Sequence, residues 1–154
     1  MQTTSFHQHL ERLLERFASL DDGCVADYIP ELTKVDPDWF GIAIVTNDGH
    51  VYQVGDTRQP FSIQSISKAF TFGIALEDQG EALVASRINV EPSGEAFNSI
   101  SLEPETGRPL NPMINAGAIV ATSLVNGEDG DAKLLHIQEK FAKYAGRKLH
   151  VDEA

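Results

Sequence analysis

A serine and a lysine three residues apart, Ser65 and Lys68, have the residue types and the spacing for nucleophilic catalysis. On a helix this spacing places both side chains on one face, with their Cβ atoms about 5–6 Å apart. A serine hydroxyl is a poor nucleophile until a base removes its proton, and a lysine amine can be that base where burial lowers its pKa. The N–H groups at the start of a helix can stabilise the oxyanion that then forms.

The same pair also has a plain structural interpretation, in which Ser65 is a helix N-cap and Lys68 is a surface lysine. A four-residue pattern recurs by chance, so the spacing alone is weak evidence. Two features favour catalysis. Lys68 opens onto an apolar run, residues 69–76, where an unpaired lysine would be costly to bury, and residues 60–68 include no acidic side chain to pair with it. On the residues alone, both interpretations stay open.

The elements around this pair can be predicted from periodicity and turn residues. The apolar run after Lys68 predicts a buried helix, preceded by a loop over residues 56–60. Upstream, two strands over residues 40–45 and 51–54 flank Asn-Asp-Gly at residues 47–49, which is a strong hairpin signal.

Three more helices are predicted, and one long stretch is not assigned. Amphipathic helices are expected over residues 5–20 and 131–145, and a second buried helix, rich in small residues, over residues 111–120. Residues 79–108 have an irregular pattern marked by turns. Within the third helix Asn115 stands among apolar residues, where a buried amide must find partners. It could contact a substrate or cap its own helix.

Composition limits the classes of function. With 154 residues, 42% of them apolar, the chain fits one ordinary domain with a real core. A net charge of -11 argues against nucleic acid and anionic membranes as partners, and no run is long enough to span a bilayer. A single cysteine, Cys24, fits a reducing compartment, and the N-terminus lacks a secretory pattern. These features predict a cytoplasmic location.

Five motifs in a fixed order make the sequence similar to the serine-dependent glutaminases of the bacterial type. They are ADYIP at 26–30, GD at 55–56, FSIQSISK at 61–68, EPSG at 91–94 with FN at 97–98, and NPMINAGA at 111–118. The resemblance runs from about residue 25 to the end of the chain. It implies an α+β fold, helices with a small antiparallel sheet, of the β-lactamase and DD-peptidase type.

The resemblance also implies a reaction and a set of site residues. The reaction is hydrolysis of L-glutamine to L-glutamate and ammonia, without a metal or an organic cofactor. By position, Ser65 is the nucleophile and Lys68 its base, Gln64 and Asn115 contact the glutamine, and Tyr28 lies near the reacting centre. Relatives of this type form dimers or tetramers, so a homo-oligomer is expected.

The chain departs from this family in its length. Glutaminases of this type are about twice as long, within the usual range of one or two domains. Their later half carries a Lys-Ser-Gly strand motif that is missing here. We therefore expect residues 1–154 to be the N-terminal part of a glutaminase domain whose C-terminal half is absent, and to lack activity alone. Two alternatives stay open: another Ser-Lys acyl-transferring enzyme such as a β-lactamase, and a non-catalytic module of the same fold.

Overall fold

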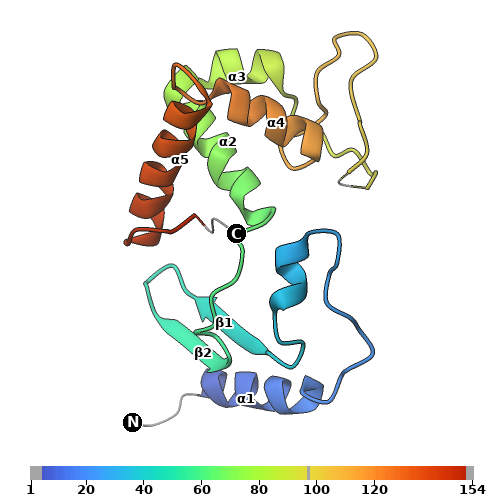
Figure 1. Cartoon of the computed structure of the whole chain (residues 1–154), viewed down its shortest axis with the longest axis vertical. Helices are drawn as coiled ribbons and strands as arrows, with labels where there is room; N and C mark the ends of the chain where they lie inside the picture. Colours follow the sequence, from blue (N-terminus) through green and yellow to red (C-terminus); the bar gives the residue numbers. More distant parts are fainter. Residues whose placement is uncertain (1–4, 97, 152–154) are drawn as a thin grey trace. The chain divides into compact units, whose positions relative to one another are not determined.

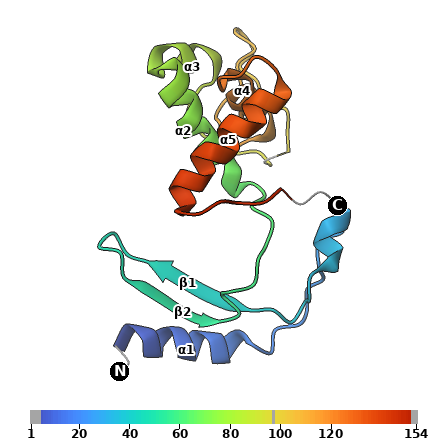
Figure 2. The ribbon, with the colours of Figure 1, turned by 60° about the vertical axis from the view of Figure 1, so that its left-hand side comes forward.

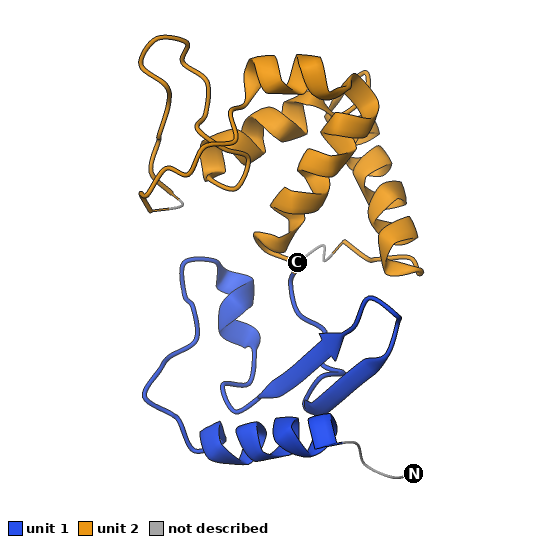
Figure 3. Cartoon of the chain, turned by 180° about the vertical axis from the view of Figure 1, so that it is seen from behind, with its two compact units in different colours: residues 1–62, 154 blue, residues 63–153 orange. Residues whose placement is uncertain are grey.

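The computed structural model describes residues 5–96 and 98–151. The chain divides between residues 62 and 63 into two compact units, coloured separately in Figure 3. Each unit is described here by itself. The expected organisation, the N-terminal part of one larger domain, stays a prediction.

The first unit is built on a β-hairpin. Strands β1 (Gly41–Val45) and β2 (Val51–Gly55) pair antiparallel, with Gly41 opposite Gly55 and Val45 opposite Val51. Gly49 closes the turn with a φ of 84°, in the left-handed region that glycine adopts at no steric cost. The predicted hairpin is therefore confirmed, with its strand ends shifted by one residue.

Helix α1 (Ser5–Phe17) runs alongside this hairpin, as Figures 1 and 2 show. The rings of Phe6 and Tyr52 meet edge to face, with centroids 4.8 Å apart. Leu10 on the helix is buried, as is Val54, which lies on the same face of β2 as Tyr52. The helix stops three residues before the predicted end, and Leu20 beyond it is 67% exposed. Packing against the hairpin thus sustains the helix only as far as Phe17.

The second unit holds four helices. They are α2 (Ile66–Gln79), α3 (Glu81–Arg87), α4 (Asn115–Leu124) and α5 (Gly130–Ala145). Its core lies where α2, α3 and α4 meet, around the fully buried side chains of Ala75, Val84, Ile88 and Ala121. Part of α2 stays at the surface, since Ile66 is 53% and Phe70 42% exposed, so the predicted buried helix is buried on one side only.

Helix α3 corrects the irregular structure predicted for residues 79–108. Gly80 separates α2 from α3 and has a φ of 78°. The seven residues after it form a helix in which Val84 is the one buried residue. A helix of two turns with one buried position is too short to show an apolar repeat. Propensity alone would have favoured it, because the segment is rich in helix formers.

Helix α4 begins later than predicted, at residue 115 instead of 111. Asn111 and Pro112 form a turn instead, and the helix presses back onto that turn. A Cβ atom on Gly117 would lie only 1.9 Å from the main-chain oxygen of Asn111. Only glycine allows this close approach.

Helix α5, predicted over residues 131–145, is confirmed within one residue. Asp129 caps it by accepting a hydrogen bond of 2.8 Å from the N–H of Ala132. Its other end packs on α2, where the rings of Phe70 and Phe141 lie 6.0 Å apart.

Candidate active site

Ser65 lies at the start of α2, and its hydroxyl does not cap the helix. Its backbone is already helical, with φ -68° and ψ -6°, and its side chain makes no cap hydrogen bond. The residue is exposed. Ser65 therefore occupies the N-cap position, as the structural interpretation predicted, but its side chain makes no capping hydrogen bond.

The residue before the serine has a strained backbone. Gln64 has a φ of 45°, and it is the one described non-glycine residue with a positive φ. Its main-chain oxygen accepts hydrogen bonds from both the N–H of Ser67 at 3.1 Å and the Ser67 hydroxyl at 2.7 Å. Such strain commonly marks functional sites, where the surrounding structure holds a residue in an unfavourable conformation.

Lys68, half-buried one turn after Ser65, bridges the starts of two helices. Its Nζ atom donates to the side-chain oxygen of Asn115 at 2.6 Å and to the main-chain oxygen of Met113 at 3.0 Å. Lys68 lies in the first turn of α2 and Asn115 in the first turn of α4. The interpretation of Lys68 as an ordinary surface lysine is therefore wrong.

The structure excludes one of the two sequence-based interpretations of Asn115, the helix cap. The N-cap of α4 is Ile114, and no side chain caps this helix. Asn115 is the first helical residue, is exposed, and turns its amide oxygen to Lys68. A capping role is excluded, and a contact between Asn115 and a substrate stays a prediction.

The turn that carries these acceptors was missed by the sequence analysis. Asn111 accepts hydrogen bonds from the N–H groups of Met113 at 3.0 Å and Ile114 at 3.2 Å. Its own amide donates to the main-chain oxygen of Glu91 at 3.0 Å. The Asn-Pro pair signals a turn in the sequence, but no pattern indicates that this turn meets Lys68.

Tyr28 lies in the first unit, two residues before a short 3-10 helix (Pro30–Lys34), and is 73% exposed. Ser65, Gln64, Lys68 and Asn115 all belong to the second unit. The structure thus joins Lys68 and Asn115 by a direct contact near Ser65 and Gln64. The place of Tyr28 at the reacting centre stays a prediction.

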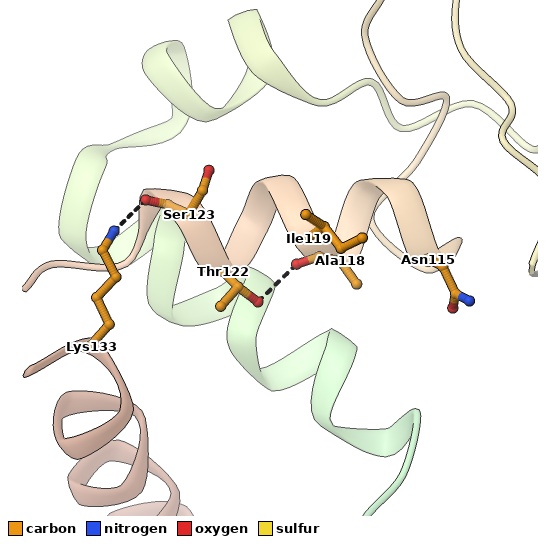
Figure 4. A pocket seen from close by; sticks show the side chains of 6 residues that line it. All are labelled: Asn115, Ala118, Ile119, Thr122, Ser123 and Lys133. Atoms are coloured by element: carbon orange, nitrogen blue, oxygen red, sulfur yellow. Dashed lines mark hydrogen bonds between the residues drawn. The ribbon is translucent and has the colours of Figure 1, made fainter. Parts of the chain in front are cut away.

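An apolar groove runs along α4 from Asn115. It has a volume of about 550 Å³, and Figure 4 shows its lining from Asn115 to Ser123, with Lys133 reaching across from α5. Its polar side chains are engaged locally: Thr122 donates to the main-chain oxygen of Ala118 at 2.9 Å, and Lys133 donates to the main-chain oxygen of Val125 at 2.8 Å. Asn115, the hydrogen-bond partner of Lys68, lies at one end of this groove.

Residues 5–96 and 98–151 contain no group of three or more His, Cys, Asp and Glu side chains that could hold a metal ion. In the same part of the chain, no helix has the length and apolar character needed to cross a membrane.

Comparison with solved structures identifies the class of fold. A probable glutaminase named ybaS matches with a TM-score of 0.86 at 40% sequence identity, over 96% of this chain and 48% of that one. A probable glutaminase from Bacillus subtilis, solved with 6-diazo-5-oxo-L-norleucine, matches with a TM-score of 0.80 at 32% identity, over 96% of this chain and 44% of that one. The helices with their small antiparallel sheet therefore have the β-lactamase-like fold of these enzymes.

Sequence comparison narrows the class to one family. The family model described as Glutaminase matches residues 23–154, and the chain belongs to the glutaminase family. It is 51% identical over 147 residues to a glutaminase of Microcystis aeruginosa, covering 96% of this chain and 44% of that protein. It is 55% identical over 140 residues to a glutaminase of Trichormus variabilis, covering 91% and 42%. The chain thus spans less than half the length of these curated relatives.

Proposed function

We propose that this chain supplies the nucleophile of a glutaminase, which hydrolyses L-glutamine to L-glutamate and ammonia through an acyl-enzyme. Membership of the glutaminase family supports the substrate. The observation that carries the chemistry is Lys68, held by Asn115 and Met113 one turn after Ser65. This arrangement supplies a nucleophile and a positioned base, the two groups that a serine amidohydrolase needs first.

The two acceptors on Lys68 orient its amine. The Lys68 nitrogen donates hydrogen bonds to Asn115 and Met113. A neutral lysine amine also carries a lone pair, and we assign the lone pair of Lys68 to the hydroxyl proton of Ser65. Contact between the Lys68 amine and the Ser65 hydroxyl stays a prediction.

Acylation then follows from these groups. Lys68 takes the hydroxyl proton as the Ser65 oxygen attacks the side-chain amide carbon of glutamine, and the new C–O bond gives a tetrahedral oxyanion. N–H groups at the start of α2 stabilise this oxyanion. The C–N bond breaks, and ammonia leaves with a proton returned by Lys68, or with one supplied by Tyr28, which then takes the proton held by Lys68. The product is a glutamyl ester of Ser65.

Deacylation repeats the same proton transfers with water. Lys68 takes a proton from a water molecule, the resulting hydroxide attacks the ester carbon, and the ester C–O bond breaks. The proton returns from Lys68 to the Ser65 oxygen, and glutamate is released. Gln64 and Asn115 are assigned to contacts with the substrate, beside the residues that react. No step uses a metal or an organic cofactor.

The decisive test is a chimera in which this chain replaces the matched region of the Microcystis aeruginosa glutaminase. We expect the chimera to release ammonia from glutamine. Ser65→Ala should lower turnover by about 10⁴-fold or more, as for other serine nucleophiles. Ser86→Ala is the matched control, since the Ser86 hydroxyl only donates to the Leu83 main-chain oxygen on α3. A folded Ser65→Ala chimera that keeps its turnover would refute the assignment.

The assembly and the location of the enzyme belong to the same proposal. We infer a homo-oligomer, a dimer or a tetramer, acting in the cytoplasm. The composition supports this location, because the one cysteine in the chain, Cys24, is exposed and forms no disulfide. Sedimentation of the chimera would distinguish a monomer from these assemblies.

A further inference from the structure

Asn111 fixes the turn that faces Lys68 through both the oxygen and the nitrogen of its side-chain amide. The amide oxygen accepts from the N–H groups of Met113 and Ile114 at 3.0 and 3.2 Å, which closes the turn before α4. The amide nitrogen donates to the Glu91 main-chain oxygen at 3.0 Å, which ties the turn to a segment twenty residues earlier. Three hydrogen bonds from one side chain thus hold the conformation of residues 111–114.

Both acceptors on Lys68 depend on this turn. One is the main-chain oxygen of Met113, inside the turn, and the other is the side chain of Asn115, the residue directly after it. Gly117 adds a second restraint, because α4 touches the main chain of Asn111 at a spot where a Cβ atom would not fit. The direction of the turn therefore decides where the Lys68 nitrogen is held.

We propose that Asn111 is a positioning residue, which holds the turn so that Met113 and Asn115 fix the amine of Lys68. Its relevance to catalysis rests on the proposed function, whereas its effect on Lys68 does not. Lysine has a flexible four-carbon side chain that gains geometry only from its partners. A displacement of about 1 Å in a reacting group can lower a rate about 10²-fold, so a loose turn would weaken a base that is chemically intact.

The side-chain ammonium of Lys68 can be observed directly by NMR in the 154-residue chain labelled with ¹⁵N-lysine. Lysine ammonium protons held by two acceptors exchange slowly with water and give resolved signals, and Lys68→Arg identifies the signal of Lys68. In Asn111→Ala we expect the exchange rate of Lys68 to rise by about tenfold, the scale of one lost hydrogen bond to a charged group.

Lys133 provides an internal control in the same spectrum. It donates to the main-chain oxygens of Ser123 and Val125, so it is held by two carbonyl groups much as Lys68 is, but at the far end of α4. A general loosening of the unit would speed the exchange of both lysines. A positioning role for Asn111 changes Lys68 alone.

Asn111→Asp is the conservative variant. A carboxylate keeps the acceptor for Met113 and Ile114 and loses only the donor to Glu91, so most of the protection of Lys68 should return. Rapid exchange of Lys68 in the unmodified chain would overturn the proposal even if Asn111→Ala failed to fold. Unchanged Lys68 exchange in folded Asn111→Ala, or equal changes at Lys68 and Lys133, would also overturn it. Because glutaminase turnover is not measured here, these outcomes are independent of the proposed function.

Discussion

At the scale of single residues, the candidate site is marked by helix starts without side-chain caps and by an unusual backbone conformation. Ser65 occupies the N-cap position of α2 without a capping hydrogen bond from its side chain, and Asn115 begins α4 without capping it. Gln64, the residue before Ser65, has a positive φ, a conformation that costs about 1–3 kcal/mol in a non-glycine residue. These local departures gather around Lys68, which is the residue that the proposed chemistry needs to position.

Two helical glycines differ in the space around them, so their alanine substitutions form a matched pair. Gly117→Ala should lower the free energy of unfolding by about 1–3 kcal/mol, because its Cβ would overlap the main chain of Asn111. Gly73→Ala, within α2, meets nothing within 4 Å and should raise it by about 0.5–1 kcal/mol. Urea unfolding followed by circular dichroism measures both. Equal effects of the two alanines would show that α4 does not press on the turn.

At the scale of elements, α5 is attached to the end of α2 by polar contacts. Nε2 of His136 lies 3.1 Å from both carboxylate oxygens of Asp78, whose side chain is only 7% exposed. The same carboxylate accepts from the N–H of Asn126 at 2.9 Å, just after α4. Asp78 thus joins α2, α4 and α5, and holds the four-helix unit in which Lys68 and Asn115 meet.

The charge on Asp78 makes this junction sensitive to acid. Burial raises the pKa of Asp78, but the N–H of Asn126 and the imidazole of His136 together outweigh it and lower the pKa below the ordinary value of 3.8. The folded state therefore binds the proton more weakly than the unfolded state does. The stabilisation is complete above the unfolded pKa of 3.8 and is lost as the pH falls through the lower folded value.

Asp78→Asn should accordingly lower the free energy of unfolding by about 1–3 kcal/mol at neutral pH, the range for hydrogen bonds to a charged group. The difference from the unmodified chain should shrink once the pH falls below 3.8. Glu139→Gln, at an exposed position on α5, is the control and should change stability by less than about 0.5 kcal/mol. A difference that stays constant with pH would mean that the Asp78 charge does not stabilise the junction.

At the scale of the whole molecule, the chain contains the proposed nucleophile but spans less than half the length of its relatives, 44% of the Microcystis aeruginosa protein. It folds into two units, and the predicted substrate contacts at Gln64 and Asn115 lie in the second. The regions of the relatives outside the match are where we expect the other groups that hold glutamine.

The 154-residue chain by itself should therefore release ammonia from glutamine at close to the background rate. Loss of one oxyanion donor typically lowers a rate about 10²–10³-fold, and loss of substrate positioning lowers it further. The measurement is ammonia released over hours from a sample whose intact mass is known. Acylation by a penicillin, followed by mass spectrometry, tests the β-lactamase alternative, and none is expected. Robust glutamine turnover would instead mean that a second copy of the chain completes the site.

Much of this protein was determined by local sequence. The hairpin follows from Asn-Asp-Gly between two apolar runs, and α1 and α5 follow from their apolar repeats, because turn residues and periodicity act over a few neighbouring positions. The types and spacing of Ser65 and Lys68 made them candidates for catalysis, and the ordered motifs were sufficient to recognise the family. Each of these signals can be observed without knowing which distant segments meet.

The remaining features depend on contacts between segments that are distant in the sequence, so only the tertiary structure shows them. α4 starts at residue 115, where Gly117 packs against the Asn111 main chain, and α3 packs its Val84 into a core with Ala121. The contact between Lys68 and Asn115 joins residues 47 positions apart. No local pattern records it, because a hydrogen bond between two helix starts is set by how the helices pack.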